Sequence, residues 1–520
     1  MAISRAARVI RDTSYLVAGQ FVVGLASLLP SAWLARNLPS GELSAWPACV
    51  SLVAVVYTLS NFGFRDCFAR EIPKLLSRGE DDRACSMLRG GLLLVTVSTL
   101  LLSLMAYLLA DPVTAIILKN EVPANVVRLL AIAVFLTTMA THLEWFQNAF
   151  QQYKLFALSR TLRNVIRPVG SVVCYWMGGI EGAVIGLSIG PAVGCVVGLI
   201  SLWPRLRQGM GLASASSLFR ISMPYFASGI SAGLLSHADY VLVGAIGGTR
   251  SLATYYVAYR IVEYVAHVDA HLMDTMLPKL SEAAHRGRVA FQEGFTKCSR
   301  YYFLALVPLH IGLAAVGRPI ITLYAGEEYS AAGNVFSVLC LYLLVQTFFS
   351  LYRQHIIALG NRWHPLVLDS LLALIGTLLI ALLSAYWGSM GAAAARGLAP
   401  LLVLPVAIFL TKRVFEPRHS RQAVLLGAMG SAMTLCFTMI WLGAFSSSAV
   451  EALAILITPL LYLLMLRGRL RADDIDLLRS LVPEAARSST SGRRAFDALD
   501  RFYVRPSSDS SSVEILPRQG

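Results

Sequence analysis

Charged residues are scarce in this chain. Only 14% of its 520 residues are Asp, Glu, Lys or Arg, whereas 56% are hydrophobic. Soluble globular domains carry about 25% charged residues, so this composition excludes an ordinary soluble protein and indicates a polytopic membrane protein. The net charge of +14 comes from short basic clusters between apolar segments. No basic domain interleaved with aromatic residues is present, which argues against a nucleic-acid partner.

Several motifs of enzymes are also missing. There is no P-loop GxxxxGK[ST], no HExxH and no nucleophile elbow, so direct use of ATP and these hydrolytic mechanisms are not predicted. The eight cysteines form no CxxC pair and have no histidine at metal-ligand spacing, so we expect neither a disulfide framework nor a metal site. No loop is long enough for a soluble catalytic domain. We predict that the protein is not an enzyme and has no catalytic residues and no cofactor.

Apolar segments long enough to cross a bilayer of about 30 Å recur along nearly the whole chain. About fourteen transmembrane helices are predicted, at 14–36, 44–64, 89–110, 126–150, 161–178, 182–203, 223–246, 253–275, 300–318, 333–357, 364–387, 390–411, 423–444 and 450–466. The first follows a basic arm without a convincing cleavage site, so it is interpreted as an uncleaved span rather than a signal peptide.

The basic residues give the orientation of these spans. With the N-terminus inside, 37 of the 44 Lys and Arg residues fall in inside segments or at the inside ends of spans, five fall on the outside, and two, Arg260 and Arg396, lie deeper within spans. Lys and Arg concentrate in the cytoplasmic loops of membrane proteins, so we expect both termini to be cytoplasmic. The localisation that follows is the bacterial inner (cytoplasmic) membrane, crossed many times.

The sequence repeats itself at a spacing of about 209 residues, which indicates two lobes of the same topology. The matching features are Gly182-Ala183 with Gly391-Ala392, Pro191 with Pro400, Tyr15 and Gly19 with Tyr225 and Gly229, and Pro73-Lys74-Leu75 with Pro278-Lys279-Leu280. The predicted fold is all-α, with two six-helix lobes related by a pseudo-two-fold axis and two extra C-terminal helices. Their boundaries are 1–210, 211–416 and 417–466, and a polar cytoplasmic tail, expected to be disordered, occupies 467–520. Alternating-access transporters place their substrate between such repeats.

A polar stripe marks the segment 253–279. Six of its side chains fall within roughly 60° of one another on a helix, namely those of Tyr256, Arg260, Glu263, His267, His271 and Asp274. Asp269 points the opposite way. Ionised groups in lipid cost several kcal/mol each, so the stripe faces either buried ion partners or a water-filled pathway. Six groups on one face favour the pathway.

Other spans carry further candidate residues. Arg163 and Arg167 lie one turn apart and either snorkel to the membrane interface or face inward, where guanidinium groups suit phosphate. Arg396 is deep in its span, which predicts an anionic ligand or a carboxylate on another helix. Asp239 lies on a small and polar face of the seventh span, and Gln20 lies on the matching face of the first. The sixth span has glycines at four-residue spacing, which predict close helix packing. They are Gly186, Gly190, Gly194 and Gly198.

Three stretches carry a family resemblance. They resemble a known pattern and are Asn61-Phe62-Gly63-Phe64 with Arg70-Glu71-Ile72, Asp239-Tyr240-Val241-Leu242-Val243-Gly244 with Tyr255, Ala258 and Arg260, and Gly326-Glu327-Glu328-Tyr329 before Ala332. It is that of the polysaccharide-transporter (O-antigen flippase) branch of the multidrug/oligosaccharidyl-lipid/polysaccharide exporter superfamily. One departure is Ala253, where the family usually has glycine. The resemblance implies a flippase that moves a polyprenyl-pyrophosphate-linked oligosaccharide to the outer leaflet by alternating access, for surface or exopolysaccharide biosynthesis.

In this reading the substrate-binding residues are Arg163, Arg167, Arg260, Arg396 and Gln20. The residues expected to couple transport to a proton or sodium gradient are Asp239, Glu263, His267 and His271. The expected partners are the lipid-linked glycan, membrane lipids, and the polysaccharide polymerase and export machinery, with the flippase itself a monomer. The alternatives are a cation-coupled multidrug efflux antiporter, which usually has about twelve spans and an acidic cavity, and a lipid II flippase.

Overall fold

The computed structural model is all α-helical in the part of the chain that it describes, which confirms the predicted fold class. That part comprises residues 28–39, 42, 46, 53, 60, 64–116, 123–208, 211–359, 363–413 and 416–444. Gln20, Asn61 to Gly63, the span predicted at 450–466 and the tail 467–520 lie outside it.

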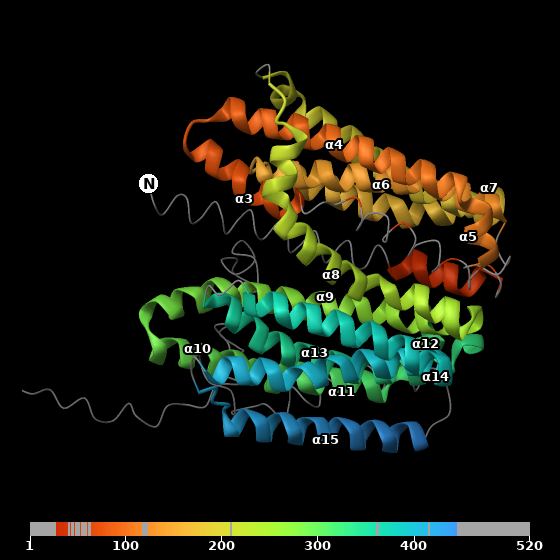
Figure 1. Ribbon diagram of the computed structural model, residues 1–520. Helices are drawn as coiled ribbons and strands as arrows, with labels where there is room; N and C mark the ends of the chain where they lie inside the picture. Colours follow the sequence, from red (N-terminus) through yellow and green to blue (C-terminus); the bar gives the residue numbers. More distant parts are fainter. Residues whose placement is uncertain are drawn as a thin grey trace, which may run out of the picture.

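One group of helices forms the upper half of Figure 1. It contains α3 (Phe64–Ser77), α4 (Asp81–Leu108), α5 (Ala110–Ile116), α6 (Ala124–Ala149) and α7 (Tyr153–Arg207). Helix α6 packs between α4 and α7 and also contacts α3. Helix α8 (Ala215–Gly247) contacts α3 and α4 near its beginning and α9 and α14 of the other group near its end, so it connects the two.

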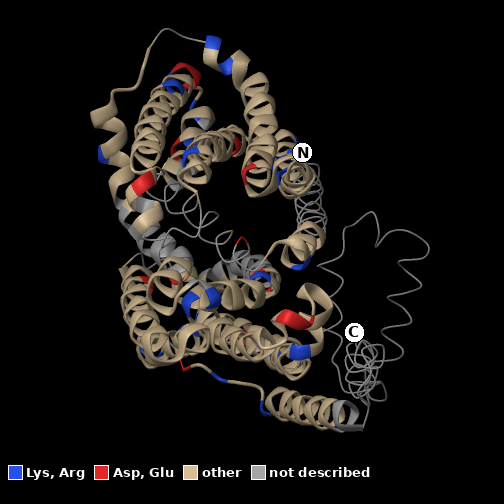
Figure 2. Cartoon of the chain, turned by 90° about the vertical axis from the view of Figure 1, so that its right-hand side faces the viewer, with Lys and Arg blue, Asp and Glu red and all other residues tan. Residues whose placement is uncertain are grey.

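The second group forms the lower half of Figure 1. It contains α9 (Thr249–Arg286), α10 (Arg288–Tyr301), the π-helical turn η1 (Tyr302–Leu306), α11 (Val307–Ala315), α12 (Gly317–Ala325), the 3₁₀ turn η2 (Glu327–Tyr329), α13 (Ala332–Ala358) and α14 (Trp363–Lys412). Helix α13 packs along α9 and α14. Helix α15 (Arg421–Ala444) lies on the outside of this group against α11 (Figures 1 and 2).

The helices have the lengths and surfaces of membrane spans. Among the described residues, six helices are long and apolar enough to cross a membrane, or seven if the bent pair Arg288–Ala315 and Gly317–Ala325 forms one span. Two of the six, α7 with 55 residues and α14 with 50, are broken in the middle and each covers two predicted spans. Large apolar side chains such as Leu101, Met177 and Leu382 are exposed, as expected for a surface that faces lipid. The total of fourteen spans and the lobe boundaries stay predictions.

The sequence repeat is visible in the backbone of the two broken helices. Gly179 of α7 and Gly388 of α14, 209 residues apart, have φ values of 57° and 54°, the left-handed region that glycine adopts without strain. The second half of each helix then turns back onto the first. A Cβ atom on Gly182 would lie 2.0 Å from the carbonyl oxygen of Cys174, and one on Gly391 would lie 2.0 Å from that of Leu383. The same close approach therefore occurs at equivalent positions in the two groups.

The buried cores show where the two groups are joined. One continuous cluster at the ends predicted to face outside combines residues of both, among them Leu34, Val127, Leu252 and Val335. At the opposite ends the cores are separate. One surrounds Phe146 in the first group, and the other contains Phe295, Tyr352 and Leu368 of the second. The described part of the molecule is thus packed shut at its outer end, and its inner ends have independent cores.

The repeated glycine contact gives a stability prediction. Gly182→Ala and Gly391→Ala each add a methyl group that clashes with a backbone carbonyl oxygen. Such overpacking typically costs about 1–3 kcal/mol. Each variant should lower the thermal unfolding midpoint of the purified protein. Gly178→Ala is the matched control, since a Cβ there meets nothing within 4 Å. Equal midpoints for Gly391→Ala and Gly178→Ala would contradict the inferred close approach.

Candidate functional site

A ladder of glycines positions the arginines of the first group. Cβ atoms on Gly186 and Gly190 would lie 2.3 Å from the carbonyl oxygen of Gly170 and 2.4 Å from that of Arg163. Only glycine lets the two halves of α7 approach so closely, and the predicted packing role of this ladder is confirmed. The close contact fixes the half of α7 that carries Arg163 and Arg167.

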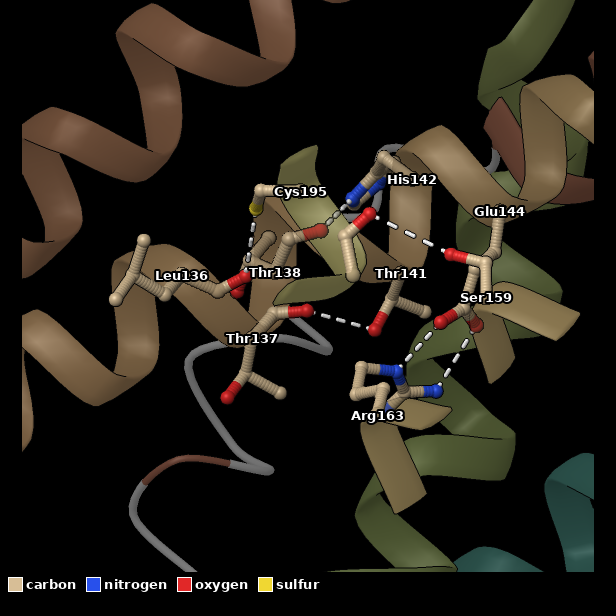
Figure 3. A network of polar contacts seen from close by, with 10 residues as sticks. Leu136, Thr137, Thr138, Thr141, His142, Glu144, Ser159, Arg163 and Cys195 are labelled. Carbon is tan, nitrogen blue, oxygen red and sulfur yellow. Dashed lines mark hydrogen bonds and ion pairs between the residues drawn. The ribbon is translucent and has the colours of Figure 1, made fainter. Parts of the chain in front are cut away.

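Arg163 is held by a carboxylate inside the first group. Its Nε and Nη2 atoms donate to Oε1 and Oε2 of Glu144 on α6, at 2.6 and 2.9 Å. Both side chains are buried, and Figure 3 shows the pair beside a row of hydroxyl groups on α6. Of the two alternatives for Arg163, the side chain faces inward rather than snorkelling. A two-point contact with a buried carboxylate leaves Arg163 neutralised in this conformation.

Arg167, one turn further along α7, lies in different surroundings. Its side chain is half-buried, and within the described part of the chain it forms no hydrogen bond or ion pair. It lies within electrostatic range of Arg163 and also of Tyr256, Arg260 and Glu263 on α9. Arg167 is therefore a positive charge of the first group that faces the polar stripe of the second.

The described side chains of the stripe are consistent with a polar boundary. Arg260 donates to Glu263 at 2.7 Å, and about a quarter to a third of each side chain remains exposed. The Arg260 guanidinium also lies over the ring of Tyr264 at 5.3 Å. The side chains of His267 and His271 lie outside the described part, as does Gln20, so their predicted roles stay predictions. The described stripe and Arg167 together present two arginines and one carboxylate between the groups.

Asp239 and Arg396, predicted as separate coupling and substrate residues, form an ion pair. Nη2 of Arg396 on α14 donates to Oδ2 of Asp239 on α8 at 2.6 Å, and Nη1 donates to the hydroxyl of Tyr259. The Tyr255 hydroxyl and the backbone N–H of Tyr240 also donate to the Asp239 carboxylate. Of the two partners predicted for Arg396, the structure shows the carboxylate on another helix. The pair joins α8, α9 and α14 within the second group, and its predicted functional roles stay untested.

One buried cluster was missed by the reasoning from sequence. Asp269 points away from the stripe, as the helical spacing predicted, and its carboxylate contacts Thr347 on α13 and His310 on α11. His310 is a single histidine in an apolar helix, so nothing in the sequence marks it as a partner. Only the packing of α11 against α13 brings it to α9.

The Arg163–Glu144 pair gives a prediction that separates a structural from a ligand-binding role. Glu144→Ala leaves Arg163 buried without its carboxylate, and breaking a buried pair costs about 3–5 kcal/mol, so we expect a large drop in the unfolding midpoint. The double variant Glu144→Met/Arg163→Met should be more stable than Glu144→Ala, because it removes both charges. A double variant less stable than the single one would contradict the structural pairing.

Comparisons with known proteins agree with this architecture. Residues 34–334 match the model of a family described as "Polysaccharide biosynthesis protein", whereas no curated protein matches by sequence. Among solved structures, the lipid II flippase MurJ in an inward closed conformation is similar, with a TM-score of 0.70 and 15% identity over 86% of this chain and 97% of that one.

Two further structures share the fold. An inward-facing multidrug resistance MATE family transporter of the MOP superfamily has a TM-score of 0.61 and 13% identity, over 82% of this chain and 98% of its own. A MOP superfamily transporter from Pyrococcus furiosus, whose title describes a binding pocket of reverse polarity, has a TM-score of 0.54 and 13% identity, over 82% and 96%. These neighbours are flippases and transporters rather than enzymes. The chain is a multi-pass membrane protein with the fold of these transporters, and it belongs to the polysaccharide biosynthesis protein family.

Proposed function

We propose that this protein flips a polyprenyl-pyrophosphate-linked oligosaccharide from the inner to the outer leaflet of the bacterial cytoplasmic membrane. The observation that carries the proposal is Arg167, a half-buried arginine that faces the other group and has no ion partner among the described side chains. An uncompensated charge at membrane depth is costly and marks a ligand pathway. Pyrophosphate is a fitting ligand, since a guanidinium group donates two parallel hydrogen bonds to anionic oxygens.

The neighbouring charges fit the same ligand. Arg260, on the opposite side of the boundary, is paired with Glu263 and stays partly exposed. A pyrophosphate that reaches Arg167 can attract Arg260 as well, and its two negative charges would then be shared between the two groups of helices. A substrate held by both groups changes its contacts when the groups move, which alternating access requires.

The packing supports a state that is open to the cytoplasm. Leu34 and Leu252 belong to one outer core, whereas the inner cores are separate. Arg36, in the helical residues 28–37 that precede the first group, donates to the backbone carbonyls of Leu323 and Tyr324 at the C-terminal end of α12. Such carbonyls carry partial negative charge and favour a cation. With the predicted orientation, this contact closes the side where the glycan leaves.

Arg167→Ala should reduce glycan export. Loss of a hydrogen bond to a charged group costs about 1.5–3 kcal/mol, so we expect a drop of about tenfold or more, with lipid-linked glycan accumulating in the membrane. Arg167→Lys should recover only part of the activity, because lysine keeps the charge but not the paired donors. Surface polysaccharide and the lipid-linked intermediate are measured in cells that contain equal amounts of the protein.

Arg128→Ala is the matched control for this test. Arg128 contacts Asp111 at 2.8 Å on an exposed surface at the other end of the first group, and exposed pairs contribute about 0–1 kcal/mol. Normal export by Arg167→Ala would remove the main support for an anionic substrate. Export of organic cations instead of glycan would favour the multidrug antiporter, and accumulation of lipid II would favour that flippase.

Arg36→Ala should open the outer side more often. Loss of its contacts to α12 removes about 1 kcal/mol from the closed state, which corresponds to about a fivefold change in population. A cysteine placed at Leu252, which is 2% exposed in this structure, should then react about fivefold faster with a membrane-impermeant thiol reagent added from outside. Arg128→Ala in the same cysteine background is the control. Equal labelling rates in both variants would show that Arg36 does not hold the closed state.

A further inference from the structure

A buried cluster of Asp269, His310 and Thr347 lies on the far side of α9 from the boundary between the groups. The Thr347 hydroxyl on α13 donates to Oδ2 of Asp269 at 2.8 Å. Nε2 of His310 on α11 lies 2.9 Å from the same oxygen. The three residues are at most 5% exposed. A carboxyl group and an imidazole are thus in contact in the interior of a membrane protein.

The cluster differs from the Glu144–Arg163 and Asp369–Arg353 pairs in its incomplete hydrogen bonding. Oδ1 of Asp269 and Nδ1 of His310 have no hydrogen-bond partner among the described side chains, and Nε2 approaches the carboxylate out of line for a hydrogen bond. Glu144–Arg163 and Asp369–Arg353 are instead two-point contacts with both oxygens occupied. Unsatisfied buried polar atoms cost free energy, so Asp269 and His310 are poorly suited to serve only as a structural pair.

The charge of this cluster depends on the protonation of Asp269 and His310 themselves. Besides His310, the titratable groups that face Asp269 among the described side chains are Tyr302 of η1 and Cys340 of α13. The Tyr302 hydroxyl already donates a hydrogen bond to the carbonyl oxygen of Leu344 at 2.7 Å. Helix α15, which packs on α11, has no charged residue after Arg421. Histidine is the residue type of this set whose reference pKa, about 6.5, lies nearest to neutral pH.

Helix α9 connects the cluster to the predicted substrate pathway. Asp269 follows Arg260 by nine residues, which at 100° per residue places the two on opposite faces of the same helix. One face of α9 therefore carries Arg260 and Glu263 at the boundary, and the other carries Asp269 against α11 and α13. The π-helical turn Tyr302–Leu306 directly precedes α11, and such turns interrupt the regular hydrogen-bond ladder and are frequent at functional sites. A change in the cluster therefore acts on α9 through Asp269 and on α11 through His310.

We propose that Asp269 and His310 form a proton-binding site that sets the conformation of this transporter. Without the proton, the pair is a carboxylate beside a neutral imidazole and carries one net negative charge. Uptake of one proton from water at the imidazole gives a neutral carboxylate–imidazolium pair, with a strengthened contact between α9 and α11, and release reverses the change. The role in coupling rests on the proposed flippase function, whereas proton binding itself does not.

The experiment measures conformation without substrate. The full-length protein in lipid nanodiscs carries spin labels on cysteines introduced at Arg78 and Val289, two exposed positions at the predicted inner ends of the two groups. The distance distribution is recorded from pH 5 to pH 8, around the ordinary pKa of histidine. The unmodified cluster should give two populations whose ratio changes with pH. Asp269→Asn and His310→Gln should each abolish that dependence, and Thr347→Val should shift its midpoint by about one pH unit.

Asp369→Asn is the control, since it removes another carboxylate of the second group, one that is partly exposed and paired with Arg353, and it should keep the pH response. The proposal is overturned if the parent protein shows no pH response, or if Asp269→Asn and His310→Gln both keep it with the same midpoint. If Asp269→Asn fails to fold, His310→Gln decides the outcome alone. Because no glycan enters the experiment, a normal pH response together with failed export predictions would leave the proton site standing and remove only the proposed substrate.

Discussion

The constraint on which this structure depends is that an ionised side chain inside a membrane must meet an opposite charge or water. Within each group of helices, described pairs of opposite charge satisfy it. Arg163 and Glu144 neutralise each other within the first group, and Arg396 and Asp239 do so within the second. Arg167 has no such partner among the described side chains and lies at the boundary between the groups. The position of a charge relative to that boundary separates structural pairs from candidate ligand residues.

The same boundary defines how the molecule can move. The outer core containing Val127 and Val335 belongs to both groups, and Arg36 adds a contact from the helical residues 28–37 to the end of α12. The inner cores share no residue. Two rigid groups joined at one end can rock about their contact, because close-packed interiors resist deformation within each group. Helix α9 has one face at the boundary between the groups and the other face packed inside its own group.

Much of the fold could be predicted from the sequence because it rests on local signals. Apolar segments of about 20 residues predict spans, and the repeat at 209 residues predicted two equivalent units whose breaks occur at Gly179 and Gly388. The candidate site was less predictable. Arg163 and Arg167 are one turn apart and have the same side chain, yet Arg163 meets Glu144, 19 residues earlier on α6, whereas Arg167 does not. Sequence spacing contains no information about which helix packs on which face.

The sequence by itself determined the class of protein, the direction in which Asp269 points and the glycine contacts that bring helices together, because these follow from composition, helical period and side-chain size. The tertiary structure decided which charges are neutralised. It paired Asp239 with Arg396, 157 residues away, and it brought His310 to Asp269 from a helix with no polar pattern of its own. Ion pairs form between whatever side chains the packing of distant helices places within about 3 Å, and that packing depends on the whole chain rather than on any one span.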